Sequence, residues 1–275
     1  MGALGRHVPV LTAVRTLLRE HGIAGDRLET WKDGSNLLVR PVPAPVILRV
    51  ATFTGRVRGD PLPYLIREVE LVTWLAARGA PVMAPASAMP PGPFVVDRWA
   101  MAAWAFVDHE PGVVPGAAES LAALDDLHAV MRAYPGALPL LGPVSGDLDL
   151  ALAFGVTEGI LEVATARELG LRRDALVTRL LALDPVLVAQ HGDAFPRNAV
   201  SARDGGVTWI DLEDGCRGSR AWDLAVLVRN TGDVAIRRGA IERVGEDALE
   251  TASALRAIQG QVWTALHDAR VRRGW

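Results

Sequence analysis

Apolar residues recur at helical spacing close to the N-terminal end of the sequence. Their intervals of three and four positions predict an amphipathic helix with an apolar face made of Val8, Leu11, Val14, Leu17 and Leu18. Beyond residue 25 the pattern changes to short apolar runs separated by turn residues, which is typical of strands. These runs predict strands over 27–31, 37–40, 46–50 and 94–96, and helical spacing returns only over 62–75.

From residue 112 onward the helical spacing dominates. It predicts helices over 121–131, 150–169 and 171–183, and again from Ala221 to the end. A short strand over 186–189 precedes His191, and a hairpin joins strands 198–201 and 207–210 through the turn residues 203–206. We therefore expect an α+β fold in which a small strand-rich lobe (residues 1–99) precedes a larger helical lobe (residues 100–275). The section 100–112 is the expected boundary.

The composition argues against several classes of protein. A chain of 275 residues, 50% of them hydrophobic, is long enough for two lobes. A net charge of -3 without a basic run disfavours a nucleic-acid partner. The most apolar stretch, 94–107, carries Asp97 and Arg98 and is too short to span a membrane. The first 25 residues hold several charges and no uninterrupted apolar core, so we expect no signal peptide. The one cysteine, Cys216, fits a reducing compartment, and we expect a cytoplasmic protein.

One short stretch carries the chemistry. Asp193 follows a predicted strand, Asn198 comes five residues later, and Asp211 ends the predicted hairpin, so all three can line one cleft. Phosphoryl transfer without a Walker loop uses such a set: a carboxylate that accepts the proton of the attacking hydroxyl, and an amide and a second carboxylate that hold Mg²⁺. Isolated Asp and Asn residues more often serve turns and helix caps. The joint spacing, and the His191 and Gly192 that precede Asp193, favour the catalytic hypothesis.

The sequence resembles the aminoglycoside phosphotransferase family, which includes choline-kinase-like small-molecule kinases. The resemblance rests on short segments that match family motifs, most strongly within residues 186–226: His191-Gly192-Asp193 with Asn198, Ile210-Asp211-Leu212-Glu213, Trp222-Asp223-Leu224-Ala225, Leu127-His128-Ala129 and Arg67-Glu68. The resemblance implies a bilobal protein-kinase-like fold and an ATP- and Mg²⁺-dependent transfer of the γ-phosphate to a hydroxyl group of a small molecule. Asp193 would be the catalytic base, and Asn198 and Asp211 would be the metal ligands.

In the strand-rich lobe the resemblance implies a helix glutamate that positions a basic residue on the third strand. Glu68 would be that glutamate. The family pattern has lysine on the strand, but Lys32 is the only lysine and lies before the 33–36 turn. Arg49 is therefore the candidate to contact phosphate, and an exposed strand arginine paired with a nearby acid is the alternative. Arginine keeps its charge and can bind phosphate through two nitrogens, but its geometry differs from that of lysine.

Four further residues receive supporting roles. The 33–36 turn, with Ser35 at its centre, would cover the nucleotide phosphates through backbone amides, although a plain hairpin turn fits the residues as well. Backbone groups of a linker over 96–99, starting at Val96, would hold the adenine base. His191 would orient the loop through hydrogen bonds, and Asp223 would cap the next helix or tie the loop in place.

The acceptor stays open at the level of the sequence. Aminoglycosides are polycations and need a pocket lined by carboxylates. The candidates lie in and around the helix predicted over 150–169, which is part of a helical insertion (about residues 147–183), and near the C-terminal end: Asp147, Asp149, Glu158, Glu162, Glu246, Asp247 and Glu250. Ordinary helix surfaces carry acids of this kind too, and a hydroxylated metabolite is the other candidate acceptor. The alternative function is a catalytically silent kinase-like protein that binds a nucleotide or a partner. A monomer and a homodimer both remain open.

Overall fold

The computed structural model describes residues 3–110, 112–203 and 205–275, with side chains from residue 7 onward. These residues form two compact units. Unit 1 consists of Met1–Ala76 and Met83–Val107, and unit 2 consists of Ala77–Val82 and Asp108–Trp275. The mixed α+β fold expected from the sequence is confirmed.

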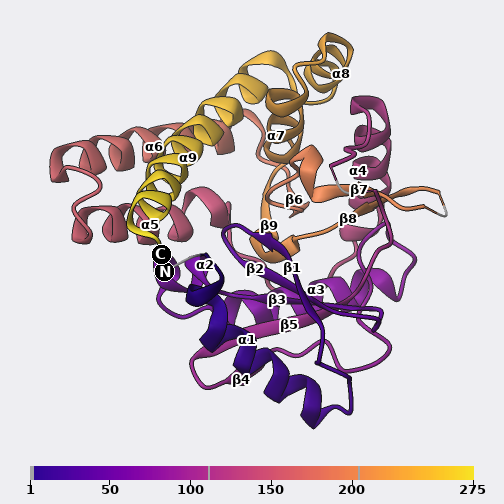
Figure 1. Cartoon of the computed structure of the whole chain (residues 1–275). Helices are drawn as coiled ribbons and strands as arrows, with labels where there is room; N and C mark the ends of the chain where they lie inside the picture. The colour runs from indigo at the N-terminus through magenta and orange to yellow at the C-terminus, as the bar shows by residue number, and fades with distance from the viewer. Residues whose placement is uncertain (1–2, 111, 204) are drawn as a thin grey trace. The chain divides into compact units, whose positions relative to one another are not determined.

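Unit 1 is built on a five-stranded antiparallel sheet in the order β1-β2-β3-β5-β4 (Figure 1). Its strands are β1 (Leu28–Asp33), β2 (Leu37–Pro41), β3 (Val46–Val50), β4 (Phe94–Val96) and β5 (Trp99–Ala105). Its helices are α1 (Ala3–Glu20), α2 (Phe53–Arg58) and α3 (Leu62–Ala76).

The two faces of this sheet have different roles. One face packs its alternate residues, among them Leu48 and Val50 of β3, against the apolar side of α1. Successive side chains of a strand point to opposite faces, so Arg49 points away from α1. It meets Glu68 of α3, a helix that packs against β5. The hydrophobic face therefore fixes the sheet, and the opposite face carries a buried charged pair.

Strand β5 corrects two expectations from the sequence. It occupies part of the section 100–112 that was expected as the boundary, and it pairs with both β3 and β4. The compact units divide after Val107 rather than between residues 99 and 100. The strand escaped detection because its residues are almost all apolar and buried, so it has no polar alternation, and its alanines carry little strand propensity.

Unit 2 is mainly helical around short strands. Its helices are α4 (Ala117–Met131), α5 (Gly146–Thr157), α6 (Val163–Leu183), α7 (Ala221–Thr231), α8 (Val234–Val244) and α9 (Glu246–Arg273). Its strands are β6 (Leu187–Gln190), β7 (Ala199–Ser201), β8 (Val207–Trp209) and β9 (Cys216–Ser219), and three short 3-10 helices are η1 (Gly142–Val144), η2 (Pro196–Asn198) and η3 (Leu212–Asp214). Helix α9 packs along α6 and α7 (Figure 1), and apolar residues of α6, α7 and α9 form the core.

The helical insertion breaks at a different place from the one expected. The sequence suggested two helices that divide at Gly170, but α5 ends at Thr157 and α6 continues through Gly170. Gly159 adopts a left-handed backbone with φ of 61° just after α5, which ends that helix. A glycine in the middle of a helix costs stability without breaking it, and that explains why Gly170 was misleading.

The short strands of unit 2 lie close to where the sequence predicted them. β7 and β8 form the expected hairpin, although Asp204 in its turn lies outside the described residues. β6 pairs with β9 and places Gln190 opposite Cys216, which is fully buried. In the described part of the chain no helix is long and apolar enough to cross a membrane.

Candidate active site

The loop after β6 brings two of the predicted residues into direct contact. The side-chain nitrogen of Asn198 donates to the backbone oxygen of Asp193 at 3.1 Å and to its carboxylate Oδ2 at 2.9 Å. Asn198 lies at the end of η2, where its backbone nitrogen donates to the backbone oxygen of Phe195 at 2.7 Å. Because the amide nitrogen is used, the carbonyl oxygen of Asn198 is the atom that could bind a metal.

The hairpin brings Asp211 next to this loop. The backbone nitrogen of Ile210 donates to the backbone oxygen of Asn198 at 2.8 Å, so Asp211 follows directly after a residue bound to Asn198. Asp211 itself has a left-handed backbone with φ of 64°. Aspartate tolerates this conformation better than most residues, and such strain gathers at functional sites.

Gly192 allows the two loops to touch. A Cβ atom at this position would lie 1.9 Å from the backbone oxygen of Asp214, and the φ of Gly192 is 88°. Only glycine fits both the close approach and the backbone conformation. The Gly in the His-Gly-Asp segment therefore determines how closely the Asp193 loop and the Asp211 loop approach each other.

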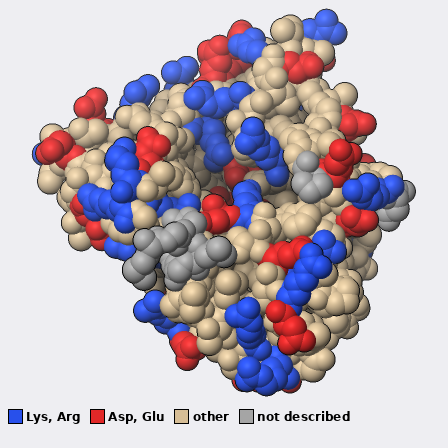
Figure 2. All heavy atoms as spheres, viewed as in Figure 1, with Lys and Arg blue, Asp and Glu red and all other residues tan. Residues whose placement is uncertain are grey.

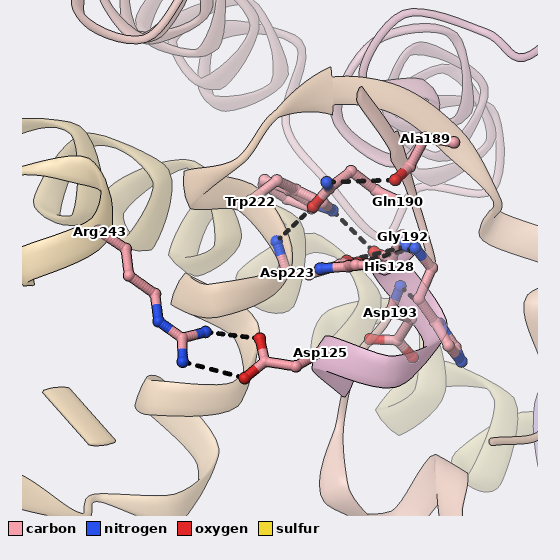
Figure 3. A network of polar contacts seen from close by, with 10 residues as sticks. Asp125, His128, Ala189, Gln190, Gly192, Asp193, Trp222, Asp223 and Arg243 are labelled. Carbon is pink, nitrogen blue, oxygen red and sulfur yellow. Dashed lines mark hydrogen bonds and ion pairs between the residues drawn. The ribbon is translucent and has the colours of Figure 1, made fainter. Parts of the chain in front are cut away.

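Asp223 anchors the loop from the first turn of α7. Its carboxylate is fully buried and accepts hydrogen bonds from the backbone nitrogens of His191 at 2.7 Å and Gly192 at 3.0 Å, and from Nε2 of His128 at 2.8 Å (Figure 3). Burial alone would raise the pKa of this carboxyl. The hydrogen bond from His128, the attraction to His128 and His191 and the backbone hydrogen bond of His191 outweigh burial and lower its pKa.

Two neighbouring residues add to the anchor. The indole nitrogen of Trp222 donates to the backbone oxygen of Gly192 at 2.8 Å, and the side-chain oxygen of Gln190 accepts from the backbone nitrogen of Asp223 at 3.2 Å (Figure 3). His128, which the sequence offered only as part of a family motif, bonds directly to Asp223. Asp223 was expected to cap a helix or to tie the loop in place, and its hydrogen bonds tie the loop.

His191 is held in one tautomer. Its Nε2 contacts the backbone oxygen of Ile210 at 3.1 Å, and since a carbonyl only accepts, Nε2 carries the proton. Its Nδ1 then accepts from the backbone nitrogen of Asp193 at 3.3 Å, and its ring packs edge-on against Trp209. Both ring nitrogens are therefore engaged in holding backbone groups, which suits a positioning role.

In unit 1 the structure joins Arg49 and Glu68. Nη2 of Arg49 forms an ion pair with Oε2 of Glu68. The side chain of Arg49 is 6% exposed and that of Glu68 is fully buried. A charged pair at this depth needs close contact to offset the loss of water. The helix glutamate and the strand arginine thus meet in the way that the family resemblance implies for glutamate and lysine.

The predicted turn and linker of unit 1 differ in outcome. The backbone oxygen of Ser35 accepts from the nitrogen of Thr54 at 2.9 Å, which ties the 33–36 turn to the start of α2. Val96, in contrast, is not in a linker. It ends β4 and pairs with Trp99 across a tight turn, so the assignment of residues 96–99 to a linker is wrong. The chain leaves unit 1 for the last time after Val107, just beyond β5, a strand that the sequence pattern did not reveal.

Sequence reasoning missed one residue at the centre of the site. Nη2 of Arg256, on α9, lies 2.5 Å from Oδ1 of Asp193, and its Nη1 donates to Oε1 of Gln259 at 2.6 Å. No sequence signal connects Arg256 with Asp193, because the two are 63 positions apart and an arginine on a helix is usually a surface residue.

The oxygen atoms of Asn198 and Asp211 fit a magnesium site of a particular kind. Within the described ranges no three His, Cys, Asp or Glu side chains cluster as a self-contained metal site would. Mg²⁺ is usually bound by one or two protein oxygens, and phosphate and water complete its shell. One amide oxygen and one carboxylate on adjoining loops meet that requirement.

The sequence matches the family described as the phosphotransferase enzyme family over residues 32–260. Among curated proteins, none matches the chain significantly. Solved structures with the same fold include an aminoglycoside phosphotransferase, APH(3'')-Id, from Streptomyces rimosus. It shares 18% sequence identity, with 91% of this chain and 98% of that chain covered and a TM-score of 0.63.

Two other similar structures are a choline kinase and an aminopropanol kinase. The choline kinase LicA from Streptococcus pneumoniae shares 14% identity, with 94% of this chain and 91% of that chain covered and a TM-score of 0.63. A microcompartment-associated aminopropanol kinase shares 18% identity, with 94% and 90% covered and a TM-score of 0.62. Similar structures also exist with ADP and streptomycin, with GDP and kanamycin, and with AMP. At these identities the likeness shows the fold.

Proposed function

Because the chain belongs to the phosphotransferase enzyme family, we propose that it is a small-molecule kinase that transfers the γ-phosphate of ATP to a hydroxyl group of its acceptor, with Mg²⁺ as cofactor. The observation that carries this proposal is the contact of Asp193 with Asn198, directly beside Asp211. Related structures with bound nucleotides support the nucleotide as phosphate donor.

Asp193 is the base of the proposed reaction. Its carboxylate orients the acceptor hydroxyl and takes its proton as the oxygen attacks the γ-phosphorus. The bond between that oxygen and the γ-phosphorus forms, the bond from the γ-phosphorus to the β–γ bridging oxygen breaks, and ADP leaves with the electron pair. Asn198 and Asp211 would hold Mg²⁺, which would neutralise charge on the phosphate oxygens.

The remaining residues position these groups. Asp223, with His128, fixes the backbone of His191 and Gly192, and His191 fixes the backbone of Asp193. In unit 1, Glu68 holds Arg49 for contact with phosphate, and the 33–36 turn with Ser35 supplies backbone amides. Arginine in place of the family lysine keeps the positive charge and the partner glutamate.

The test is ADP release from Mg·ATP across a panel of hydroxylated acceptors, with Asp193→Ala and Asp193→Asn as variants. We expect stimulation by one class of acceptor and a loss of at least about a hundredfold in both variants. Circular dichroism and thermal unfolding would establish that the variants are folded. Wild-type turnover in a folded Asp193 variant would remove Asp193 from the mechanism, and nucleotide binding without any turnover would favour the catalytically silent alternative.

A further inference from the structure

The ion pair between Arg256 and Asp193 bears on the acceptor. The side chains are 18% and 24% exposed, so the pair is accessible, and Gln259 fixes the guanidinium from its other side. Any hydroxyl group that hydrogen-bonds to Asp193 must come close to this guanidinium. The charge of Arg256 therefore acts on every acceptor that reaches the base.

The two oxygens of Asp193 have different surroundings. Oδ2 accepts from Asn198, the proposed metal ligand, at 2.9 Å. Oδ1 contacts Arg256 at 2.5 Å. Arg256 thus contacts the oxygen of Asp193 that does not bind Asn198. This position favours contact of Arg256 with the acceptor over contact with the metal ion or the nucleotide phosphates.

Most of the acids that might receive a polycation are paired with arginines. Five of the seven carboxylates that the sequence suggested for a cationic acceptor form ion pairs with arginines: Asp149 with Arg173, Glu158 with Arg273, Asp247 with Arg179, and both Glu246 and Glu250 with Arg237. These residues lie on or beside helices α5, α6, α8 and α9. On the face in view in Figure 2, acidic and basic side chains are interspersed over this part of the molecule. These pairs leave little negative charge to balance a polycationic acceptor.

The same side of α9 carries more positive than negative groups. A stripe of residues three or four positions apart lies along this side of the helix and contains no carboxylate: Arg256, Gln259, Trp263, His267 and Arg270. Burial first, and then the charge of Arg270, lower the pKa of His267, and Asp268 offsets this in part. The lowered pKa disfavours the charged form of this histidine, so the positive charge of the stripe comes mainly from its two arginines.

Resting on the proposed function, we propose that the acceptor carries an oxyanion group, a carboxylate or a phosphate, close to its reacting hydroxyl. Arg256 exchanges the carboxylate of Asp193 for this oxyanion, which it binds through two nitrogens. The exchange releases Oδ1 of Asp193 for the hydroxyl. Arg256 is then a specificity residue that couples acceptor binding to release of the base.

A matched set of acceptors tests this proposal. The set has a common three-carbon skeleton and varies in charge: glycerate, glycerol phosphate, glycerol and aminopropanediol. We expect kcat/KM for an anionic member to exceed that for glycerol by at least about tenfold, and aminopropanediol to be the poorest acceptor. Comparison of glycerate with glycerol phosphate distinguishes the two oxyanions. A preference for the cationic compound would overturn the proposal.

The variant Arg256→Gln separates acceptor recognition from other roles. We expect KM for the anionic acceptor to rise by about ten- to a hundredfold, with the differences among the four acceptors largely lost. Arg237→Gln, which removes an arginine of α8 and its exposed ion pairs with Glu246 and Glu250, is the matched control and should keep the preference. A uniform fall in kcat for all acceptors, with the ranking kept, would assign Arg256 to the transferring phosphate and contradict the proposal.

A binding measurement keeps this inference distinct from the proposed reaction. In calorimetric titrations without nucleotide, we expect glycerate or glycerol phosphate to bind the wild type and to bind Arg256→Gln at least about tenfold more weakly. If neither anion binds the wild type at millimolar concentration, the inference fails even where Asp193-dependent ADP release supports the proposed function. If the anion binds but no ADP is released, the proposed reaction fails and the oxyanion site stands.

Discussion

Each unit contains an ion pair between an arginine and a carboxylate, and the two pairs differ in their access to water. Arg49 and Glu68 of unit 1 are almost completely buried between a strand and a helix. Arg256 and Asp193 of unit 2 keep roughly a fifth of their surface exposed, at 18% and 24%. Water cannot replace a lost partner in the first pair, but it can in the second. A buried pair therefore fixes a geometry, whereas an accessible pair can exchange partners during a reaction.

The largest expected effect comes from removing one partner of the buried pair. Glu68→Ala leaves the guanidinium of Arg49 without its carboxylate in a buried position and should destabilise the protein by about 3–5 kcal/mol. Denaturant unfolding measures this loss. Glu68→Gln keeps an acceptor oxygen and should cost less, and a loss below about 1 kcal/mol in the alanine variant would contradict the importance of the pair.

The contact between the two loops of unit 2 comes next. Gly192→Ala places a Cβ against the backbone of Asp214 and should cost roughly 3 kcal/mol, together with most of the activity. Gly170→Ala is the matched control, because that glycine lies in α6 with open space around it, and it should be neutral or stabilising. Equal effects of the two substitutions on thermal unfolding would show that the loops can separate without cost.

Asp223 predicts how stability depends on pH. Its pKa is lowered in the folded protein, so the stabilisation that it provides is complete above its unfolded pKa of about 3.9 and is lost as pH falls below that value. We expect the wild type to be more stable than Asp223→Asn by about 2 kcal/mol near pH 7, with the difference shrinking below about pH 4. A difference that does not change over this acidic range would rule out the ionised carboxylate as its source.

The smallest effect on stability is expected at Arg256. Arg256→Gln should change the free energy of unfolding by less than about 1 kcal/mol, because its ion pair is accessible to water. The same denaturant titration used for Glu68→Ala measures it. A loss as large as that of Glu68→Ala would show that the pair of Arg256 and Asp193 also fixes a geometry and does not differ from the buried pair of unit 1.

The sequence predicts best those features that depend on neighbouring residues. Strands β1 to β4 of unit 1, the hairpin and the loop with Asp193 and Asn198 follow from local turns and spacing, and the structure places them close to the predicted ranges. The likeness to phosphotransferases is confirmed by the family match. The individual roles of Asp193, Asn198 and Asp211 stay predictions, although their proximity is now visible.

What the sequence could not predict depends on distant contacts. Strand β5 has no alternation because it is buried, and Val96 was consequently assigned to a linker. The bonds from His128 to Asp223 and from Arg256 to Asp193 join residues 95 and 63 positions apart. Such pairs arise from the packing of helices, and neither hydrophobic spacing nor turn chemistry encodes them.

Cys216 has a practical consequence for spectroscopy. It is the chain's only cysteine, and its thiol is fully buried in β9 against β6. A thiol-reactive label would therefore react slowly with the native protein. One cysteine introduced on an exposed position of each unit would accept a pair of fluorophores or spin labels with little background. Because the native thiol contributes little labelling, the distance between two introduced labels can be followed as nucleotide and acceptor are added.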